Sequence, residues 1–209
     1  MKVVVIAARK GGSGKTTLAG HLAVQAERAG DGPAALADID PQGSLAAWWN
    51  ERAAPTPVFA QATVPGFAED MERLRDLGIK VLIVDTPPAL TSAIAAVVAL
   101  ADLVLIPSRP SPHDLRSIGA TAELVEHLGK PLVFVLNGAT PRARINAEAL
   151  SVLSRHGMLA PVVVHQRIDF AASMIDGRTV MELPDPSRSC EEMERLWSYL
   201  SARLEGTVP

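Results

Sequence analysis

The rest of this chain is arranged around residues 6–17, IAARKGGSGKTT. They follow an apolar run at residues 3–6 and precede a helical pattern. Glycines let a backbone turn tightly and direct its N–H groups at an anion, and the N-terminus of the next helix adds about half a positive charge. In such loops a lysine reaches the outer phosphates and a hydroxyl group binds Mg²⁺. The order of these parts predicts a nucleotide site.

The loop is a variant of the general phosphate-binding pattern G-x-x-x-x-G-K-[ST]. Lys10 stands where that pattern opens with glycine, and the loop then runs to Lys15 and Thr16. The variant reads K-G-G-x-G-K-[ST]-T and carries a second lysine at its entrance. We expect the whole loop to bind nucleotide, through Lys10, Gly11, Gly12, Ser13, Gly14, Lys15, Thr16 and Thr17.

The bulk composition predicts one globular domain spanning residues 1–209. The chain has 48% hydrophobic and 21% charged residues, and its formal net charge is −3. That charge gives no global attraction to nucleic acid, so any DNA binding would need a local patch. The single cysteine, Cys190, fits a reducing compartment. Lys10 and the glycines interrupt the N-terminal apolar run, so we expect no signal peptide and a cytoplasmic protein.

Apolar runs alternate with helical patterns along the chain. The runs lie at residues 3–7, 34–37, 81–84, 103–107, 132–136 and 162–164, with helical patterns between them. Strands that are apolar throughout are typical of a sheet covered by helices on both faces. The sequence therefore predicts an α/β fold with a doubly wound, mostly parallel sheet flanked by helices. A last helix is expected from about Ser189, where Ser189 and Glu192 resemble a capping box.

Polar side chains follow three of the predicted strands. Asp38 and Asp40 follow one, Asp85 ends the run VLIVD, and Asn137 follows a third. In sheets of this kind ligands bind at the carboxyl ends of the strands. Mg²⁺ prefers oxygen ligands and keeps several waters. We therefore expect a metal site formed by Thr16, Asp40 and Asp85.

Three motifs together resemble the ParA/MinD family of deviant Walker A ATPases. They are K-G-G-x-G-K-T-T, D-x-D-P-Q at residues 38–42 and V-D-T-P-P at residues 84–88. Two weaker matches resemble short, plasmid-type ParA proteins of the ParF kind. One is the proline-rich segment 106–115, and the other is R-x-x-[FY]-x-x-S-x-x-x-G from Arg167 to Gly177. The resemblance covers essentially the whole chain.

The resemblance implies an ATPase that uses ATP and Mg²⁺, with three catalytic residues. Lys10 is expected to reach across a face-to-face homodimer to the phosphates bound by the other subunit. Lys15 is expected to hold the β- and γ-phosphates in its own subunit. Asp40 is expected to position the attacking water.

Three further roles follow from the same resemblance. Asp85 and the loop after it are expected to sense the γ-phosphate. Asn137 matches the family asparagine that reads the adenine edge, and Pro161 is expected to lie against the base.

The function implied by the resemblance is ATP-dependent partition of plasmid or chromosomal DNA. An ATP-bound sandwich dimer would bind DNA non-specifically, associate with the nucleoid and be stimulated by a ParB- or ParG-like adaptor protein. Phosphate contacts add up along a basic surface. The candidate DNA contacts are five arginines in the C-terminal third, namely Arg142, Arg144, Arg155, Arg167 and Arg178.

Other functions remain open at this point. Related orphan ATPases position protein cargo such as carboxysomes or chemotaxis clusters, and no residue separates these cargoes from DNA. A metabolic P-loop synthetase generally lacks a lysine at the position of Lys10. A non-hydrolysing scaffold would not need Lys15, Thr16, Asp40 and Asp85 together. Membrane binding would call for a basic amphipathic C-terminal helix, whereas the last helix here is rich in glutamate, so we expect no membrane partner.

Overall fold

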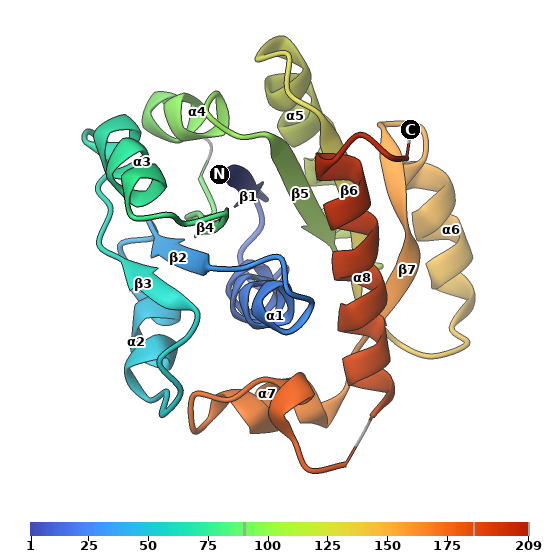
Figure 1. The fold of residues 1–209 in the computed structure, drawn as a ribbon. Helices are drawn as coiled ribbons and strands as arrows, with labels where there is room; N and C mark the ends of the chain where they lie inside the picture. The colour runs from blue at the N-terminus through green and yellow to red at the C-terminus, as the bar shows by residue number, and fades with distance from the viewer. Residues whose placement is uncertain (90, 186, 209) are drawn as a thin grey trace.

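The computed structural model describes residues 1–89, 91–185 and 187–208, which build a seven-stranded sheet between two layers of helices (Figure 1). The strand order is β3-β2-β4-β1-β5-β6-β7, and every pairing is parallel. The predicted doubly wound α/β fold is confirmed. The strands are β1 (Lys2–Ile6), β2 (Ala34–Asp38), β3 (Val58–Ala60), β4 (Val81–Asp85), β5 (Leu103–Ser108), β6 (Leu132–Ala139) and β7 (Met158–His165).

Helices cover both faces of the sheet. One face is packed by α1 (Lys15–Arg28), α2 (Ser44–Asn50), α7 (Ile168–Met174), the 3-10 helix η1 (Val180–Glu182) and α8 (Arg188–Leu204). The opposite face is packed by α3 (Phe67–Asp76), α4 (Ser92–Val98), α5 (Pro112–His127) and α6 (Arg144–Leu153). Figure 1 shows α1 and α8 on one side and α3, α4 and α5 on the other. Among the described residues, no helix combines the length and apolarity needed to cross a bilayer.

The central strand β1 shows why its sequence is apolar at every position. Val4 and Ile6 join the core beneath α1 and α8, whereas Val3 and Val5 join the core beneath α4 and α5. Successive side chains of a strand point to opposite faces, so a strand with helices on both sides needs apolar residues throughout. The continuous run at the start of the chain therefore encodes a buried central strand.

The strand register brings the polar positions to one edge. Because β1 lies between β4 and β5, the loop that follows Ile6 leaves the middle of the sheet. Ile6 pairs with Asp85, and Asp85 also pairs with Asp38 on β2. Parallel strands end at a common edge, and this edge holds the predicted polar residues.

The start of α8 differs from the predicted capping box. The N-cap is Ser187, whose Oγ accepts a hydrogen bond from the N–H of Cys190 at 3.3 Å. Ser189 lies inside the helix, where its hydroxyl donates to Asp169 at 3.0 Å, and Glu192 binds β7 instead of capping. The prediction that Ser189 and Glu192 form a capping box was wrong. Both side chains have tertiary partners that are distant in sequence.

Candidate nucleotide-binding site

The phosphate loop requires glycine where it joins α1. Gly14 is the N-cap of the helix with φ of 94°, in the left-handed region that favours glycine. A Cβ built at Gly14 would lie 2.1 Å from Nδ2 of Asn137. A side chain here would therefore strain the backbone and displace Asn137. Because Gly14 carries none, the helix N-terminus lies open to an anion.

Thr16 and Asp85 meet beside the loop. The Thr16 hydroxyl donates to Oδ2 of Asp85 at 2.5 Å, and Asp85 as a residue is 1% exposed. Its other oxygen, Oδ1, is buried and has no hydrogen-bond partner among the described residues. A buried oxygen without a partner is costly. A hydroxyl beside a carboxylate fits Mg²⁺, which is often held by few protein ligands together with phosphates and water.

Burial shifts the protonation of the charged groups in this site. It raises the pKa of Asp85 to about 7, although the Thr16 hydrogen bond and the charge of Lys15 oppose the rise. Burial also lowers the pKa of Lys15, whereas Asp85 and Asp40 favour its charged form. Desolvation penalises the charged form of each group. A bound polyanion would favour the charged form of Lys15, and the cation that accompanies it would favour the charged form of Asp85.

Asp38 and Asp40 lie on a tight turn between β2 and α2. The Asp38 carboxylate accepts hydrogen bonds from the N–H groups of Asp40, Leu45 and Ala46, each at 3.0 Å. Oδ1 of Asp40 accepts from the N–H of Gln42, also at 3.0 Å. Asp38 therefore builds the turn, whereas Asp40 is half-buried and its charge acts on both Lys15 and Asp85.

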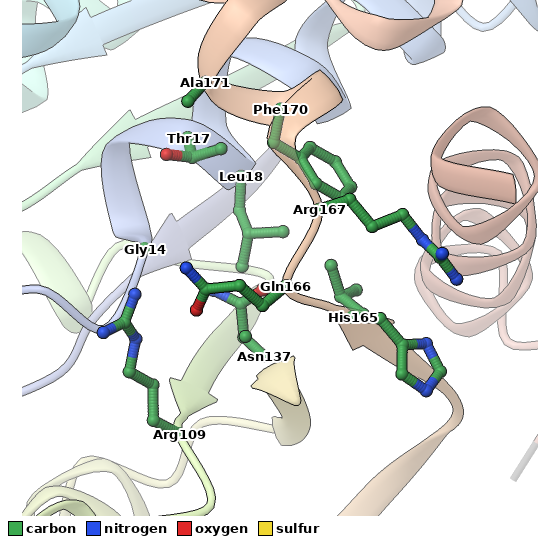
Figure 2. A pocket seen from close by; sticks show the side chains of 12 residues that line it. Gly14, Thr17, Leu18, Arg109, Asn137, His165, Gln166, Arg167, Phe170 and Ala171 are labelled. Atoms are coloured by element: carbon green, nitrogen blue, oxygen red, sulfur yellow. The ribbon is translucent and has the colours of Figure 1, made fainter. Parts of the chain in front are cut away.

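A hollow lies beside Asn137, against the first turn of α1 (Figure 2). Asn137 is buried and its Nδ2 donates to the carbonyl of Ser13 at 2.7 Å. This bond fixes the amide, so that Oδ1 is the free acceptor. The hollow is lined by Gly14, Thr17, Leu18, Arg109, Asn137, Gly138, Val164, His165, Gln166, Arg167, Phe170 and Ala171.

The predicted site residues divide into three groups. The loop residues, Thr16, Asp40 and Asp85 lie at one edge of the sheet, with Asn137 beside the loop. Lys10 is exposed in the loop, and its action on another subunit stays a prediction. Pro161 lies in β7 and is exposed; its carbonyl accepts from Arg195 of α8 at 3.3 Å, and it does not line the hollow with Asn137. The structure therefore does not support Pro161 as a base contact.

Three of the five candidate DNA-binding arginines are paired with carboxylates. Arg144 pairs with Glu148, Arg178 with Asp176, and Arg167 with the buried Glu192. These pairs reduce the free positive charge of the proposed DNA surface. Arg142 and Arg155 are the two for which the described residues show no ion pair.

Sequence reasoning missed several residues around the hollow. Arg109 directly follows β5 and Gln166 directly follows β7, so the carboxyl-end rule applied to every strand would have found both. His21 is fully buried in α1, and its ring packs edge-on against Phe170 with centroids 5.1 Å apart. No local pattern identifies this role of His21, because Val180 and Phe170, which it contacts, are more than a hundred residues away.

Comparisons with known proteins agree with this geometry. Residues 4–180 match the family model described as the CobQ/CobB/MinD/ParA nucleotide binding domain. The chain is 37% identical to the maintenance of carboxysome distribution protein A of Gloeobacter kilaueensis, over 94% of this chain and 95% of that protein. It is 35% identical to a ParA protein of Rhizobium radiobacter over 57% of this chain and 54% of that protein.

The solved structure of a Cyanothece McdA variant in complex with ATP has the same fold. It superposes with a TM-score of 0.75 at 18% identity, covering 99% of this chain and 96% of that one. The phosphate loop, the Thr16–Asp85 pair and the matched family model lead to one conclusion. The chain belongs to the CobQ/CobB/MinD/ParA family of nucleotide-binding domains, as a ParA/MinD-type member.

Proposed function

We propose that this protein is an ATP-hydrolysing switch that positions a protein cargo inside the cell, of the kind that distributes carboxysomes. The observation that carries the proposal is the end-to-end similarity to a carboxysome distribution protein, at 37% identity over 94% of the chain. The phosphate loop, the Thr16–Asp85 pair and the exposed Lys10 support it, because together they suit an ATPase whose site is completed by a second subunit.

Adenine is the base that suits the hollow beside Asn137. With Nδ2 donating to the loop, Oδ1 is left to accept a hydrogen bond. The exocyclic amine of adenine is a donor at the position where guanine carries an acceptor oxygen. A guanine oxygen against Oδ1 would leave two acceptors facing each other. ATP is therefore expected to compete more effectively than GTP for binding.

The proposed hydrolysis depends on positioning and on neutralising negative charge, which are the main needs of phosphoryl transfer. Lys15 and the loop N–H groups would hold the phosphates, and Asp40 would orient the attacking water. Mg²⁺, when bound beside Thr16 and Asp85, would neutralise charge on the phosphate oxygens. Lys10 of a second subunit would complete the site, so that hydrolysis and dimerisation both depend on ATP.

The similarity favours protein cargo over the plasmid or chromosome partition that the sequence motifs suggested first. The carboxysome-distribution relative is 37% identical over 94% of the chain, whereas the chromosome-partitioning ATPase Soj of Thermus thermophilus is 24% identical over 97% of the chain. A small adaptor protein on the cargo would stimulate hydrolysis. Weak DNA binding by the ATP-bound dimer would give a cytoplasmic protein that associates with the nucleoid. The two arginines without ion pairs, Arg142 and Arg155, are the first candidates for that contact.

Deletion of the gene in its native host tests the cargo. Clustered or unevenly inherited carboxysomes with normal plasmid retention would support the proposal. If instead a plasmid is lost while protein assemblies stay evenly spaced, the result would favour DNA partition with a ParB- or ParG-like adaptor. The purified protein should hydrolyse ATP without any small organic co-substrate. A rate that depends on such a compound would contradict both readings and favour a synthetase.

A further inference from the structure

Helix α2 connects the Asp40 turn to a distant part of the molecule. At its first turn, the Asp38 carboxylate binds the N–H groups of Leu45 and Ala46 as well as that of Asp40. The helix is only seven residues long, and it follows directly on the Asp40 turn. A shift of α2 would therefore move the turn that carries Asp40.

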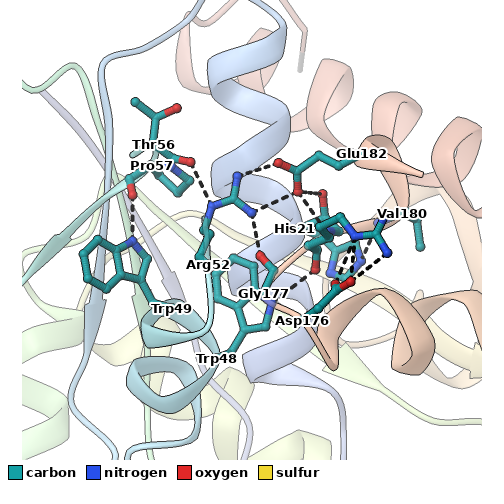
Figure 3. A network of polar contacts seen from close by, with 12 residues as sticks. His21, Trp48, Trp49, Arg52, Thr56, Pro57, Asp176, Gly177, Val180 and Glu182 are labelled. Atoms are coloured by element: carbon teal, nitrogen blue, oxygen red, sulfur yellow. Dashed lines mark hydrogen bonds and ion pairs between the residues drawn. The ribbon is translucent and has the colours of Figure 1, made fainter. Parts of the chain in front are cut away.

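The far end of α2 is held by Arg52, whose side chain is only 3% exposed. Its guanidinium donates to both oxygens of Glu182 at 2.6 and 2.9 Å, and to the carbonyl of Gly177 at 2.7 Å (Figure 3). Its Nε donates to the carbonyl of Thr56 at 2.9 Å. A bidentate arginine–carboxylate pair fixes orientation as well as distance. Arg52 thus anchors α2 to the segment that contains η1.

The backbones on the two sides of this contact also approach closely. Gly177 has φ of +74°, and a Cβ built there would lie 2.4 Å from the backbone N and Cα of Arg52. Trp48 of α2 donates from Nε1 to the carbonyl of Arg178 at 3.2 Å. The guanidinium carbon of Arg52 lies 5.4 Å from the centroid of the Trp48 ring. Only glycine at position 177 permits this approach.

The η1 segment is in turn attached to the phosphate-loop helix. Glu182 also accepts from the N–H and hydroxyl of Thr179, each at 2.8 Å. The next N–H, that of Val180, donates to Nε2 of His21 at 3.2 Å. The opposite nitrogen of His21 then carries the proton and donates to the carbonyl of Thr17 at 2.7 Å. The chain of contacts therefore runs from the Asp40 turn to the first turn of α1.

We propose that Arg52 is a positioning residue for ATP hydrolysis. Through Glu182 and Gly177 it fixes α2, and thereby the Asp40 turn, relative to the phosphates held at the start of α1. This inference rests on the proposed function, because it assigns Asp40 to the attacking water. Arg52 itself does not line the hollow beside Asn137, and its side-chain hydrogen bonds go to Glu182, Gly177 and Thr56 rather than to the loop or Asp85.

The test compares Arg52→Gln, Glu182→Gln, the double variant and the conservative Arg52→Lys, at a temperature well below the melting point of each. Trp197→Phe is the matched control, because it removes the 2.7 Å hydrogen bond to Asp31 far from α2. The readouts are kcat and KM for ATP, melting temperature and ATP-dependent dimerisation by light scattering.

Arg52→Gln and Glu182→Gln are each expected to lower kcat about tenfold or more, because a displacement of about 1 Å from productive geometry can cost on the order of a hundredfold. KM should stay within about twofold and dimerisation should persist. The double variant should be no slower than the slower single variant, because both remove one contact. Arg52→Lys should be intermediate, and Trp197→Phe should melt earlier with unchanged kcat.

Unchanged kcat in Arg52→Gln and Glu182→Gln, with a lowered melting temperature, would show that Arg52 only stabilises the fold. Parallel losses of kcat and ATP affinity would also overturn the inference, because the contact would then act on nucleotide binding. If Arg52→Gln does not fold, Arg52→Lys and Glu182→Gln decide in the same way. A wild-type protein without ATPase activity would overturn the proposed function and the inference together, whereas an active wild type with unchanged variants overturns the inference alone.

Discussion

Asp85 is a buried carboxylate whose folded-state pKa, about 7, lies above its ordinary value of 3.8. A raised pKa means that the folded state prefers the protonated form. The contribution of Asp85 to stability is therefore fully present below pH 3.8 and is lost as the pH rises towards 7. At one pKa unit per 1.36 kcal/mol, the cost of the charged form is on the order of 4 kcal/mol at most.

Asp85→Asn should therefore raise the melting temperature of the nucleotide-free protein at pH 8. Asparagine keeps an oxygen for the Thr16 hydroxyl and removes the buried charge. The same variant should lose the stabilisation that ATP and Mg²⁺ together give the wild type. Thermal melts at pH 8, with and without Mg-ATP, measure both effects. If Asp85→Asn melts at a lower temperature than the wild type at pH 8 without ligand, burial is not the cause of the raised pKa of Asp85.

For the buried His21, we expect the stability of the fold to depend on pH in the opposite direction. Burial lowers its pKa from 6.5 to about 4, and Nε2 accepts a hydrogen bond that protonation would break. Stability is therefore present above pH 6.5 and falls by on the order of 3 kcal/mol as the pH drops towards 4. His21→Gln should lose this part of the pH dependence in urea unfolding, whereas exposed His127→Gln should keep it. If the unfolding free energy of His21→Gln changes with pH as steeply as that of the wild type, the pH dependence does not come from His21.

At the scale of the elements, the start of α8 provides a direct test. Ser187 supplies the cap and Ser189 does not. Ser187→Ala should cost about 1 kcal/mol of unfolding free energy, because an N–H of the first turn loses its acceptor. The exposed Ser198→Ala, in the middle of the same helix, should cost nothing measurable in the same urea titration. A loss at Ser198 equal to that at Ser187 would exclude a capping effect.

The elements themselves were largely predictable, because the strands of a doubly wound sheet are apolar throughout. Residues 3–7 and 81–84 were identified within one residue of β1 and β4. Strand β7 was predicted too short, at 162–164 instead of Met158–His165, because its buried and exposed positions alternate at the sheet edge. Local pattern recognises buried strands well and mixed edge strands poorly.

The site was predictable to the extent that it is contiguous in sequence. The phosphate loop and the carboxylates at the ends of β2 and β4 belong to short sequence motifs. The hollow beside Asn137, by contrast, joins Gly14, Arg109, Asn137 and Gln166 from four separate stretches. The contact between Arg52 and Glu182 spans 130 residues. Contacts of this kind come from the packing of elements, which no local pattern encodes.

At the scale of the whole molecule, we propose that ATP joins two copies through Lys10 and that hydrolysis, for which Asp40 positions the water, separates them. Lys10 is exposed in its own loop. Lys10→Ala should therefore retain some nucleotide binding but lose dimerisation. Asp40→Ala should bind ATP, hydrolyse it slowly and accumulate as a dimer.

Light scattering measures the oligomeric state of the wild type, Lys10→Ala and Asp40→Ala, each with ATP and Mg²⁺ or with ADP. With ADP, all three proteins are expected to be monomers. With ATP, Asp40→Ala is expected to form a stable dimer and Lys10→Ala to stay a monomer. An Asp40→Ala protein that stays monomeric in ATP, or a Lys10→Ala protein that dimerises like the wild type, would contradict this proposal.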